Sequence, residues 1–333
     1  MTPTIRLSVL DQSTATTGRA EAESITESVA LAQHCEALGY ARYWVSEHHN
    51  LPAIVGTAPE VLMAAIAATT QRMRIGSAGV MLPHYSALKV AEQFRVLEAL
   101  APGRIDLGVG RAPGGDMRTA RSLNPNAHAA ADDFPEQVRD LQAWTSLPSH
   151  QGIVAHPQGP HAPEIWVLGS SNYGAQLAAH FGLPYAYAYF FVDGRGVEEA
   201  LGLYRQLYRP STRHPEPQAT ICVWALVADT HAAAMHHALG RERWRVDRER
   251  GIFGPLEAPD VIAARGFTAA EQPTVDAMRQ KAFVGTAAEV GAQLRALAES
   301  LQLSELVVNT WAHDPAVRRA SYALLAREFE LGL

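Results

Sequence analysis

The sequence is poor in cysteine and has no long apolar run. Two of its 333 residues are cysteine, Cys35 and Cys222, too few for a disulfide framework, and neither lies in a metal or redox motif. No 18 consecutive apolar residues occur, so no transmembrane helix is expected. The N-terminus lacks the apolar core of a signal peptide. We therefore expect a reduced, cytoplasmic protein with no membrane partner.

The sequence also has fewer basic than acidic side chains, and lysine is nearly absent. The chain has 28 basic and 34 acidic side chains, a net charge of −6, and its only lysines are Lys89 and Lys281. An acidic protein is a poor match for a nucleic acid, so none is expected as a partner. Hydrophobic residues make up 47% and charged residues 19%, a globular composition that excludes a disordered chain.

Short apolar runs of β type alternate with stretches of helical periodicity along most of the chain. We expect strands at Ile5–Leu10, Tyr43–Ser46, Arg74–Leu82, Ile105–Val109, Ile165–Leu168, Tyr185–Tyr189, Thr220–Val227 and Glu305–Val308. Helices are expected over 22–38, 59–69, 87–100, 134–146, 172–181, 196–208, 231–248, 286–301 and 315–331. Strands this continuously apolar belong to a parallel sheet buried on both faces. Eight such units favour a (β/α)8 TIM barrel over an open doubly wound sheet.

One segment breaks this alternation. Residues 249–284, between the seventh helix and the eighth unit, are rich in glycine, proline and charge. An interruption of this length is typical of a functional lid or an added helical excursion. We predict a single domain, residues 1–333, with an inserted mobile lid at 249–284.

In a barrel the chemistry lies where the strands end, and the second strand ends in Glu47, His48 and His49. Adjacent strand residues point to opposite faces, so the two histidines do not readily bind one metal ion. No metal site is expected here or among the other histidines. His48 is then either a structural histidine or an acid, base or hydrogen-bond donor at the barrel mouth.

The next three strands end in small residues and one arginine. Ala78 and Gly79 allow a flat ligand close to the backbone, or simply pack tightly. Arg111 lies in a loop that is neither a dinucleotide fingerprint nor a Walker loop, and is either a phosphate partner or a solvent-facing turn residue. Ser170 and Ser171 open a helix, as an N-cap or as part of a phosphate site. Because these segments follow neighbouring strands, Arg111 and this helix start can share one phosphate.

Together these segments resemble the bacterial luciferase-like flavin-dependent monooxygenases, in the subgroup of stand-alone oxidoreductases related to the alkanal monooxygenase α chain. The similarity covers about residues 5 to 330. The strings that carry it are LSVLDQS (Leu7–Ser13), YWVSEHHN (Tyr43–Asn50), GSAGVMLP (Gly76–Pro83), LKVAEQF (Leu88–Phe94), PGRIDLGVGRAP (Pro102–Pro113), VLGSS (Val167–Ser171) and FVGT (Phe283–Thr286).

The resemblance implies a two-component flavoprotein monooxygenase. Such an enzyme takes reduced FMN from a separate NAD(P)H:flavin reductase and oxygenates a small organic substrate with O₂ through a C4a-peroxyflavin. It also implies a homodimer that pairs through helices 59–69 and 87–100. We expect their apolar faces to exceed what one barrel buries, and the residues concerned are Val61, Leu62, Ile66, Val90, Phe94 and Leu97.

Site residues follow from the same resemblance, position by position. His48 matches the catalytic histidine, and 249–284 matches the mobile lid. Ala78 and Gly79 match the backbone beside the flavin ring, where the family often has a non-proline cis peptide. The remaining cofactor-binding positions are Val167 and Gly169 near the ring and Arg111, Ser170, Ser171 and Tyr173 at the phosphate.

Two departures from the family pattern argue against light emission. Gly110 stands where the light-emitting enzymes carry a reactive cysteine, and Gly169 where they carry a glutamate. An F420-dependent dehydrogenase and a non-catalytic flavin-binding protein remain as alternatives. The acidic charge disfavours the first, and retention of all eight units disfavours the second. The substrate is not specified, although about half of the rings near the sixth strand are expected to face it: Tyr185, Tyr187, Tyr189, Phe190 and Phe191.

Overall fold

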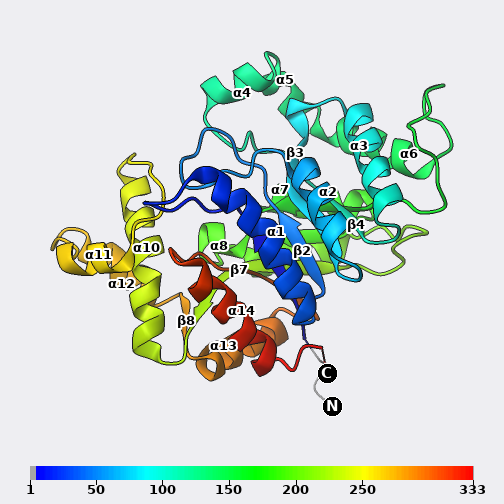
Figure 1. Ribbon diagram of the computed structural model, residues 1–333. Coiled ribbons are helices and arrows are strands. Elements are labelled where there is room, and N and C mark those ends of the chain that lie inside the picture. Colours follow the sequence, from blue (N-terminus) through cyan, green and yellow to red (C-terminus); the bar gives the residue numbers. More distant parts are fainter. Residues whose placement is uncertain (1–4, 333) are drawn as a thin grey trace. The chain divides into compact units, whose positions relative to one another are not determined.

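The computed structural model describes residues 5–332 and shows parallel strands that alternate with helices (Figure 1). The chain has the (β/α)8 TIM-barrel fold predicted from the sequence. It divides into two compact units. Unit 1 contains the residues before Arg42, residues 51–55 and the chain from Cys222 onward, and unit 2 contains Arg42–Asn50 and Gly56–Ile221. No helix in the described part of the chain is long and apolar enough to cross a membrane.

Unit 2 holds five complete strands and the first residues of a sixth, β7, and each strand pairs with the next in parallel. These strands are β2 (Arg42–Val45), β3 (Arg74–Met81), β4 (Ile105–Gly110), β5 (Glu164–Gly169), β6 (Tyr185–Tyr187) and β7 (Ala219–Val227). The helices are α2 (Pro59–Thr69), the 3₁₀ turn η1 (Leu82–His84), α3 (Ala87–Leu100), α4 (Met117–Leu123), α5 (Ala127–Asp132), α6 (Phe134–Ser146), α7 (Asn172–Phe181), α8 (Tyr189–Val192) and α9 (Val197–Leu207).

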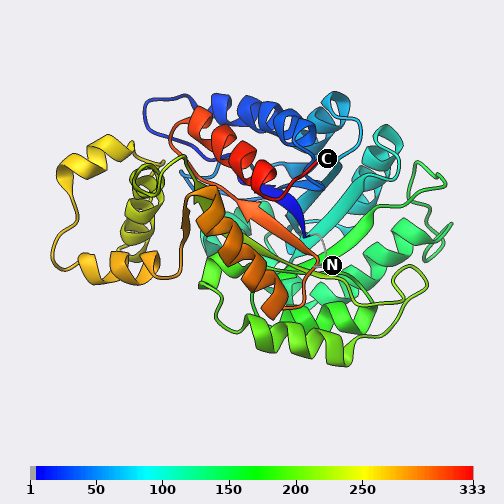
Figure 2. The ribbon, with the colours of Figure 1, turned by 90° about the horizontal axis from the view of Figure 1, so that it is seen from below.

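Unit 1 is built from both ends of the chain. Its strands are β1 (Arg6–Asp11), β9 (Glu305–Asn309), the remainder of β7 and β8 (Phe283–Gly285), adjacent in that order. Its helices are α1 (Glu21–Ala37), α10 (His231–Glu249), α11 (Pro259–Arg265), α12 (Gln272–Arg279), α13 (Ala287–Ser300) and α14 (Pro315–Glu328). Figure 2 shows α13 and α14, in orange-brown and red, side by side.

The predicted insertion is a helical excursion with its own small core. It contains α11 and α12 and ends in β8. This three-residue strand is additional to the eight strands expected from the sequence. Val275 and Met278 of α12 pack on Val246 of α10, with Phe267 against them. Arg279 pairs with Glu242 of α10 at 2.7 Å, which adds a charged contact to this packing. The segment is therefore fastened to α10 by both apolar and ionic contacts.

Two local predictions were wrong. The sixth strand ends at Tyr187 rather than Tyr189, because the Phe191 amide donates to the Ala188 carbonyl at 3.1 Å and closes the helical turn α8. The residues expected to form an exposed apolar surface on α2 and α3 are also mostly buried. Of the six residues named for them, only Val61 is exposed, because the other five are buried within their own unit. The exposed large hydrophobic residues of these helices are Val61, Val96 and Leu100.

Candidate active site

The end of β2 is organised around a fully buried carboxylate, that of Glu47. It accepts three hydrogen bonds: from the Tyr85 hydroxyl at 2.6 Å, from His49 Nε2 at 2.8 Å and from the Met81 amide at 2.9 Å. A buried carboxylate is stable only when its oxygens are matched by donors in this way. Glu47 therefore joins the end of β2 to the end of β3 and to the start of the following helix.

His48, the predicted catalytic residue, lies beside this network and is only partly exposed. Its Nδ1 lies 3.3 Å from the Gly114 carbonyl, and since a carbonyl only accepts, Nδ1 carries the proton. Burial lowers the pKa of His48 below its ordinary value, more than the Gly114 hydrogen bond raises it. The ring is thus favoured as a neutral imidazole with its lone pair on Nε2.

Residues that follow β2 and β3 also hold the loop after β4, and this loop carries Arg111. The amide of His49 donates to the Gly114 carbonyl at 3.0 Å, and His84 Nε2 donates to the Pro113 carbonyl at 2.8 Å. Gly114 has a positive φ of 63°, a backbone conformation that favours glycine at this turn. The position of Arg111 is therefore set by residues that follow β2 and β3.

Arg111 stacks on Tyr173 in the first turn of α7, with the guanidinium carbon 4.1 Å from the ring centroid. Ser171 is the N-cap residue of α7, but its hydroxyl makes no capping hydrogen bond, and Ser170 precedes it. A helix N-terminus is positively polarised, so a guanidinium beside it makes a site that favours an anion. The structure thus places Arg111 against Tyr173, close in the chain to Ser170 and Ser171, and these four residues are the ones assigned to the phosphate in the sequence analysis.

Ala78 and Gly79 form a break in the middle of β3. Their peptide bond is cis, and the register against β4 shifts between Ser77 and Val80. Ala78 is partly exposed, although the strand residues on both sides of it are buried. A Cβ at Gly79 would lie 2.8 Å from the carbonyl oxygen of Gly108, so glycine is required there. The non-proline cis peptide expected from the resemblance is confirmed.

The two predicted positions on β5 differ in exposure. Val167 is fully buried, whereas Leu168 and Gly169 are partly exposed. Leu168 was not predicted, but its side chain points toward the Ala78–Gly79 break, because its Cδ1 is the atom that a Cβ at Gly79 would meet at 2.5 Å. Alternation along the strand was the signal that could have identified it.

These residues fit a cofactor that carries a phosphate and a flat ring. A cation and an uncapped helix start match a phosphate, and a glycine-rich strand with one open position matches a flat ring. Sequence reasoning missed Glu47, Tyr85 and His84, which position the loop and the histidine. The one available signal was a glutamate directly after a buried apolar strand.

Both the sequence and the fold are similar to those of known proteins. A sequence profile described as luciferase-like monooxygenase matches residues 5–304. A luciferase-like monooxygenase of Escherichia coli (strain K12) is 37% identical over 96% of both chains. An N-acetyl-S-alkylcysteine monooxygenase of Bacillus subtilis (strain 168) is 36% identical over 97% of both. The crystal structure of apo-MsnO8 matches with a TM-score of 0.91 and 35% identity, over 98% of this chain and 99% of that one.

More distant structures show the fold alone. The oxygenating constituent of 3,6-diketocamphane monooxygenase from Pseudomonas putida, in complex with FMN, has a TM-score of 0.72 and 19% identity over 98% of both chains. An F420-dependent secondary alcohol dehydrogenase, in complex with an F420–acetone adduct, has a TM-score of 0.66 and 14% identity over 98% of this chain and 99% of that one. The fold therefore accommodates either cofactor.

Proposed function

Because this chain belongs to the luciferase-like monooxygenase family, we propose that it is an FMN-dependent monooxygenase. A separate NAD(P)H:flavin reductase supplies the reduced flavin, and O₂ is the second substrate. One oxygen atom enters a small organic molecule and the other leaves as water. The enzyme then acts on paired donors with incorporation of molecular oxygen.

The observation that carries the proposal is the anion site formed by Arg111, Tyr173 and the start of α7. Charge-assisted contacts to phosphate are strong, and stacking on Tyr173 restrains the guanidinium before a ligand arrives. Ser170 and Ser171 complete the cradle with hydroxyl and amide donors. The site suits the terminal phosphate of FMN.

Reduced FMN, when bound, supplies the electrons that activate O₂. The chain supplies the surroundings and a proton acceptor. Because Nδ1 of His48 donates to Gly114, Nε2 is the atom that takes and returns a proton. The lowered pKa keeps this nitrogen unprotonated at neutral pH, which is the state needed in a general base. Ala78 and Gly79 leave room for the ring beside β3.

A titration compares the two cofactors directly. Reduced FMN is expected to bind, and F420 to bind more weakly, because the polyglutamate tail of F420 adds negative charge to a protein of net charge −6. F420 binding more tightly than reduced FMN would replace this proposal with a dehydrogenase. Both titrations are made under anaerobic conditions with the full chain.

Rapid mixing tests the oxygenation chemistry. The protein with reduced FMN is mixed with oxygenated buffer, and the reappearance of oxidised flavin is followed by absorbance. We expect oxidation to be slower than that of free reduced FMN, and His48→Ala to restore the rate of free flavin while leaving FMN affinity nearly unchanged. Oxidation at the free rate in the wild type would favour a flavin carrier instead.

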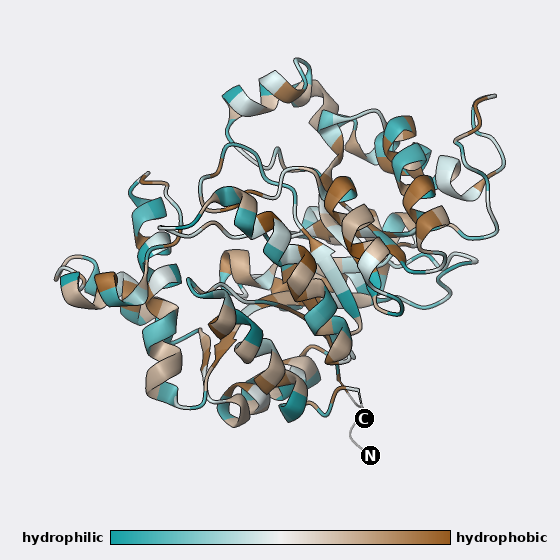
Figure 3. Ribbon diagram, in the orientation of Figure 1, coloured by the Kyte–Doolittle hydropathy of each residue, from teal (hydrophilic) through white to brown (hydrophobic). Residues whose placement is uncertain are grey.

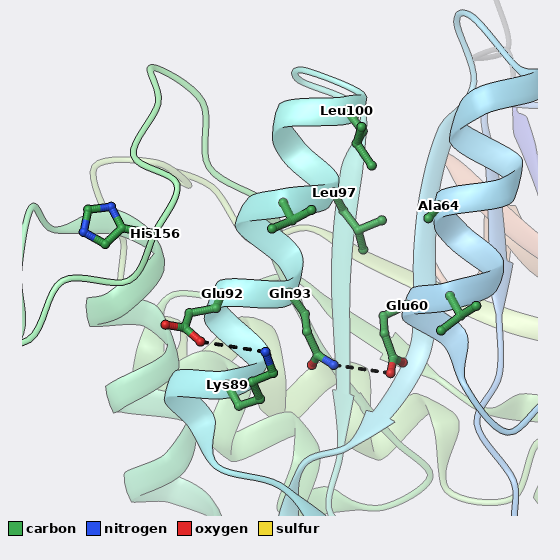
Figure 4. Close-up of a pocket in the computed structure, with 10 residues that line it drawn as sticks. Glu60, Ala64, Lys89, Glu92, Gln93, Leu97, Leu100 and His156 are labelled. Atoms are coloured by element: carbon green, nitrogen blue, oxygen red, sulfur yellow. Dashed lines mark hydrogen bonds and ion pairs between the residues drawn. The ribbon is translucent and has the colours of Figure 1, made fainter.

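The protein is also proposed to form a homodimer through α2 and α3. Figure 3 shows brown, hydrophobic positions on both helices, and the exposed ones are Val61, Val96 and Leu100. They line a hollow together with Leu97 and Lys89 (Figure 4). A second copy of the same patch is the occupant that suits it, since two-fold pairs bring identical surfaces together.

Light scattering tests this pairing at micromolar concentration. The wild type is expected to have twice the chain mass of 36.0 kDa. The double variant with Val61→Glu and Leu100→Glu is expected to have the mass of one chain. Leu207→Glu, which alters an exposed leucine of α9, is the matched control and should remain a dimer. A monomeric wild type would refute the pairing.

A further inference from the structure

The histidine that follows β3, His84, is buried, and only one of its two ring nitrogens has a hydrogen-bond partner. Its Nε2 lies 2.8 Å from the Pro113 carbonyl oxygen, and since a carbonyl only accepts, Nε2 carries the proton. Nδ1 is buried and has no partner among residues 5–332. A polar ring buried for the sake of one hydrogen bond calls for an explanation of that bond.

The surroundings of His84 hold its ring in one place. The side-chain amide of Asn124, the C-cap residue of α4, donates to the Pro83 carbonyl in η1 at 2.7 Å. The His84 ring packs edge-on against the rings of His49 and Tyr85, with centroids 6.0 and 6.2 Å apart. Backbone and ring are both restrained, so the direction in which Nε2 donates is fixed.

The acceptor of this bond lies directly before two glycines. Gly114 and Gly115 follow Pro113, and Gly114 has a positive φ of 63°. Consecutive glycines leave a backbone many conformations, so their orientation depends on contacts at either side. After the pair, Asp116 Oδ2 accepts from the Asn50 side chain at 3.0 Å. Before the pair, the Pro113 carbonyl is held by the imidazole Nε2–H.

The carbonyl between these two contacts, that of Gly114, is the one that meets His48. It accepts from the His49 amide at 3.0 Å and from His48 Nδ1 at 3.3 Å. A carbonyl oxygen has two lone pairs, so it accepts both hydrogen bonds together. The bond from His48 is the longer of the two and therefore the more sensitive to a movement of the carbonyl. The orientation of Gly114 thus decides which nitrogen of His48 carries the proton.

We propose that His84 is a positioning residue for His48. Its Nε2–H holds the Pro113 carbonyl, which orients the Gly114 carbonyl, which in turn keeps the proton of His48 on Nδ1 and the lone pair on Nε2. Arg111 lies in the same loop, so the restraint extends to the residue assigned to the phosphate. The inference rests on the proposed function in one respect only, that His48 is the proton acceptor of the oxygenation.

Nuclear magnetic resonance tests the proposal on the full chain without flavin. The protein is labelled with ¹⁵N-histidine, and long-range ¹H–¹⁵N spectra at pH 8 show which nitrogen of each ring carries the proton. The signals of His48 are those that His48→Gln removes. We expect wild-type His48 to be protonated on Nδ1. His84→Phe keeps a buried ring without a donor, and should lower the ratio of the Nδ1–H to the Nε2–H form of His48 about three- to tenfold, the size expected of one hydrogen bond.

A matched pair of variants separates positioning from packing. The amide nitrogen of His84→Gln can take the place of Nε2 and donate to Pro113, whereas that of His84→Asn is one carbon shorter and reaches only the place of Nδ1. Both variants remove the ring, so a loss of packing affects them alike. We expect the glutamine variant to keep the wild-type ratio and the asparagine variant to lower it as phenylalanine does. His128→Phe, which alters an exposed histidine of α5, is the control and should leave His48 unchanged. The proposal is overturned if His84→Asn keeps the wild-type ratio or if the glutamine and asparagine variants lower it equally.

Failure of the flavin chemistry is distinguishable from failure of this inference. The ratio of the two His48 forms is measured without flavin, so it decides the role of His84 even if reduced FMN proves not to bind. In an anaerobic titration His84→Asn is expected to weaken reduced FMN several-fold and His84→Gln not at all, because Arg111 lies in the restrained loop. Reduced FMN binding to the wild type, with a His48 ratio that does not depend on His84, leaves the proposed monooxygenase intact and removes only the positioning role.

Discussion

Glu47→Ala removes a buried acceptor on which three donors depend, the buried Met81 amide and the partly buried side chains of Tyr85 and His49. Tyr85, His49 and the Met81 amide each lose a partner. A buried donor left unmatched costs about 1–3 kcal/mol, and water entering the vacated space offsets part of the sum. We therefore expect a loss of about 3–5 kcal/mol in the free energy of unfolding, measured by urea denaturation and far-UV circular dichroism.

Two companion variants make the test specific. Glu47→Gln keeps one carbonyl oxygen for the Met81 amide, and its amide group can donate to the Tyr85 oxygen, so a loss of about 1–2 kcal/mol is expected. Glu136→Ala removes an exposed carboxylate 3.9 Å from Arg139, and should cost at most about 0.5 kcal/mol. If Glu47→Ala unfolds at the same urea concentration as Glu136→Ala, the network does not stabilise the end of β2.

Three other predictions concern single residues. Arg111→Ala is expected to weaken reduced FMN binding about ten- to hundredfold in an anaerobic titration, with the exposed Arg139→Ala as control, and unchanged affinity would remove Arg111 from the phosphate site. The pKa of His48 is lowered by burial, so the unfolded chain takes up a proton that the folded chain does not as pH falls below 6.5. The free energy of unfolding therefore decreases below that pH. His48→Gln should reduce this pH dependence, which is measured as the difference between the urea midpoints at pH 7.5 and pH 5.5. His214 is buried with neither ring nitrogen partnered among the described residues, and burial lowers its pKa. His214→Phe should therefore leave stability unchanged or raise it, most clearly at pH 5.5, and a loss above about 2 kcal/mol would mean that the ring makes polar contacts.

Periodicity was sufficient for the long elements and not for the short ones. The bounds expected for α2 and α3 are those observed, because each helix runs for several turns with buried positions repeating on one side. The helices α4 and α5 have seven and six residues, too few for a period of 3.6 to be recognised. The three-residue strand β8 was missed, whereas β6, equally short, was predicted with two residues too many at its end.

The residues assigned to the phosphate follow different strands. Arg111 follows the fourth strand and Tyr173 follows the fifth, and the structure brings these two side chains into contact. The Glu47 network was not predictable, since its donor Tyr85 is 38 residues away and convergence depends on the register of β2 and β3. The prediction of exposed apolar faces on α2 and α3 was wrong for a related reason. Helical spacing identifies an apolar stripe, but it does not show whether the rest of the unit covers that stripe.

The discontinuity of unit 1 has a consequence for synthesis on the ribosome. Its first strand, β1, pairs with β9, and Arg6 lies opposite Glu305. Nearly the whole chain must be translated before β1 meets this partner, whereas unit 2 is almost continuous from Arg42 to Ile221 and can assemble while translation proceeds. The apolar residues Leu7 and Val9 thus wait for Leu306 and Val308, their partners in β9. Nascent chains released before β9 is made would expose this strand to chaperones, and the synthesis of β9 decides when that exposure stops.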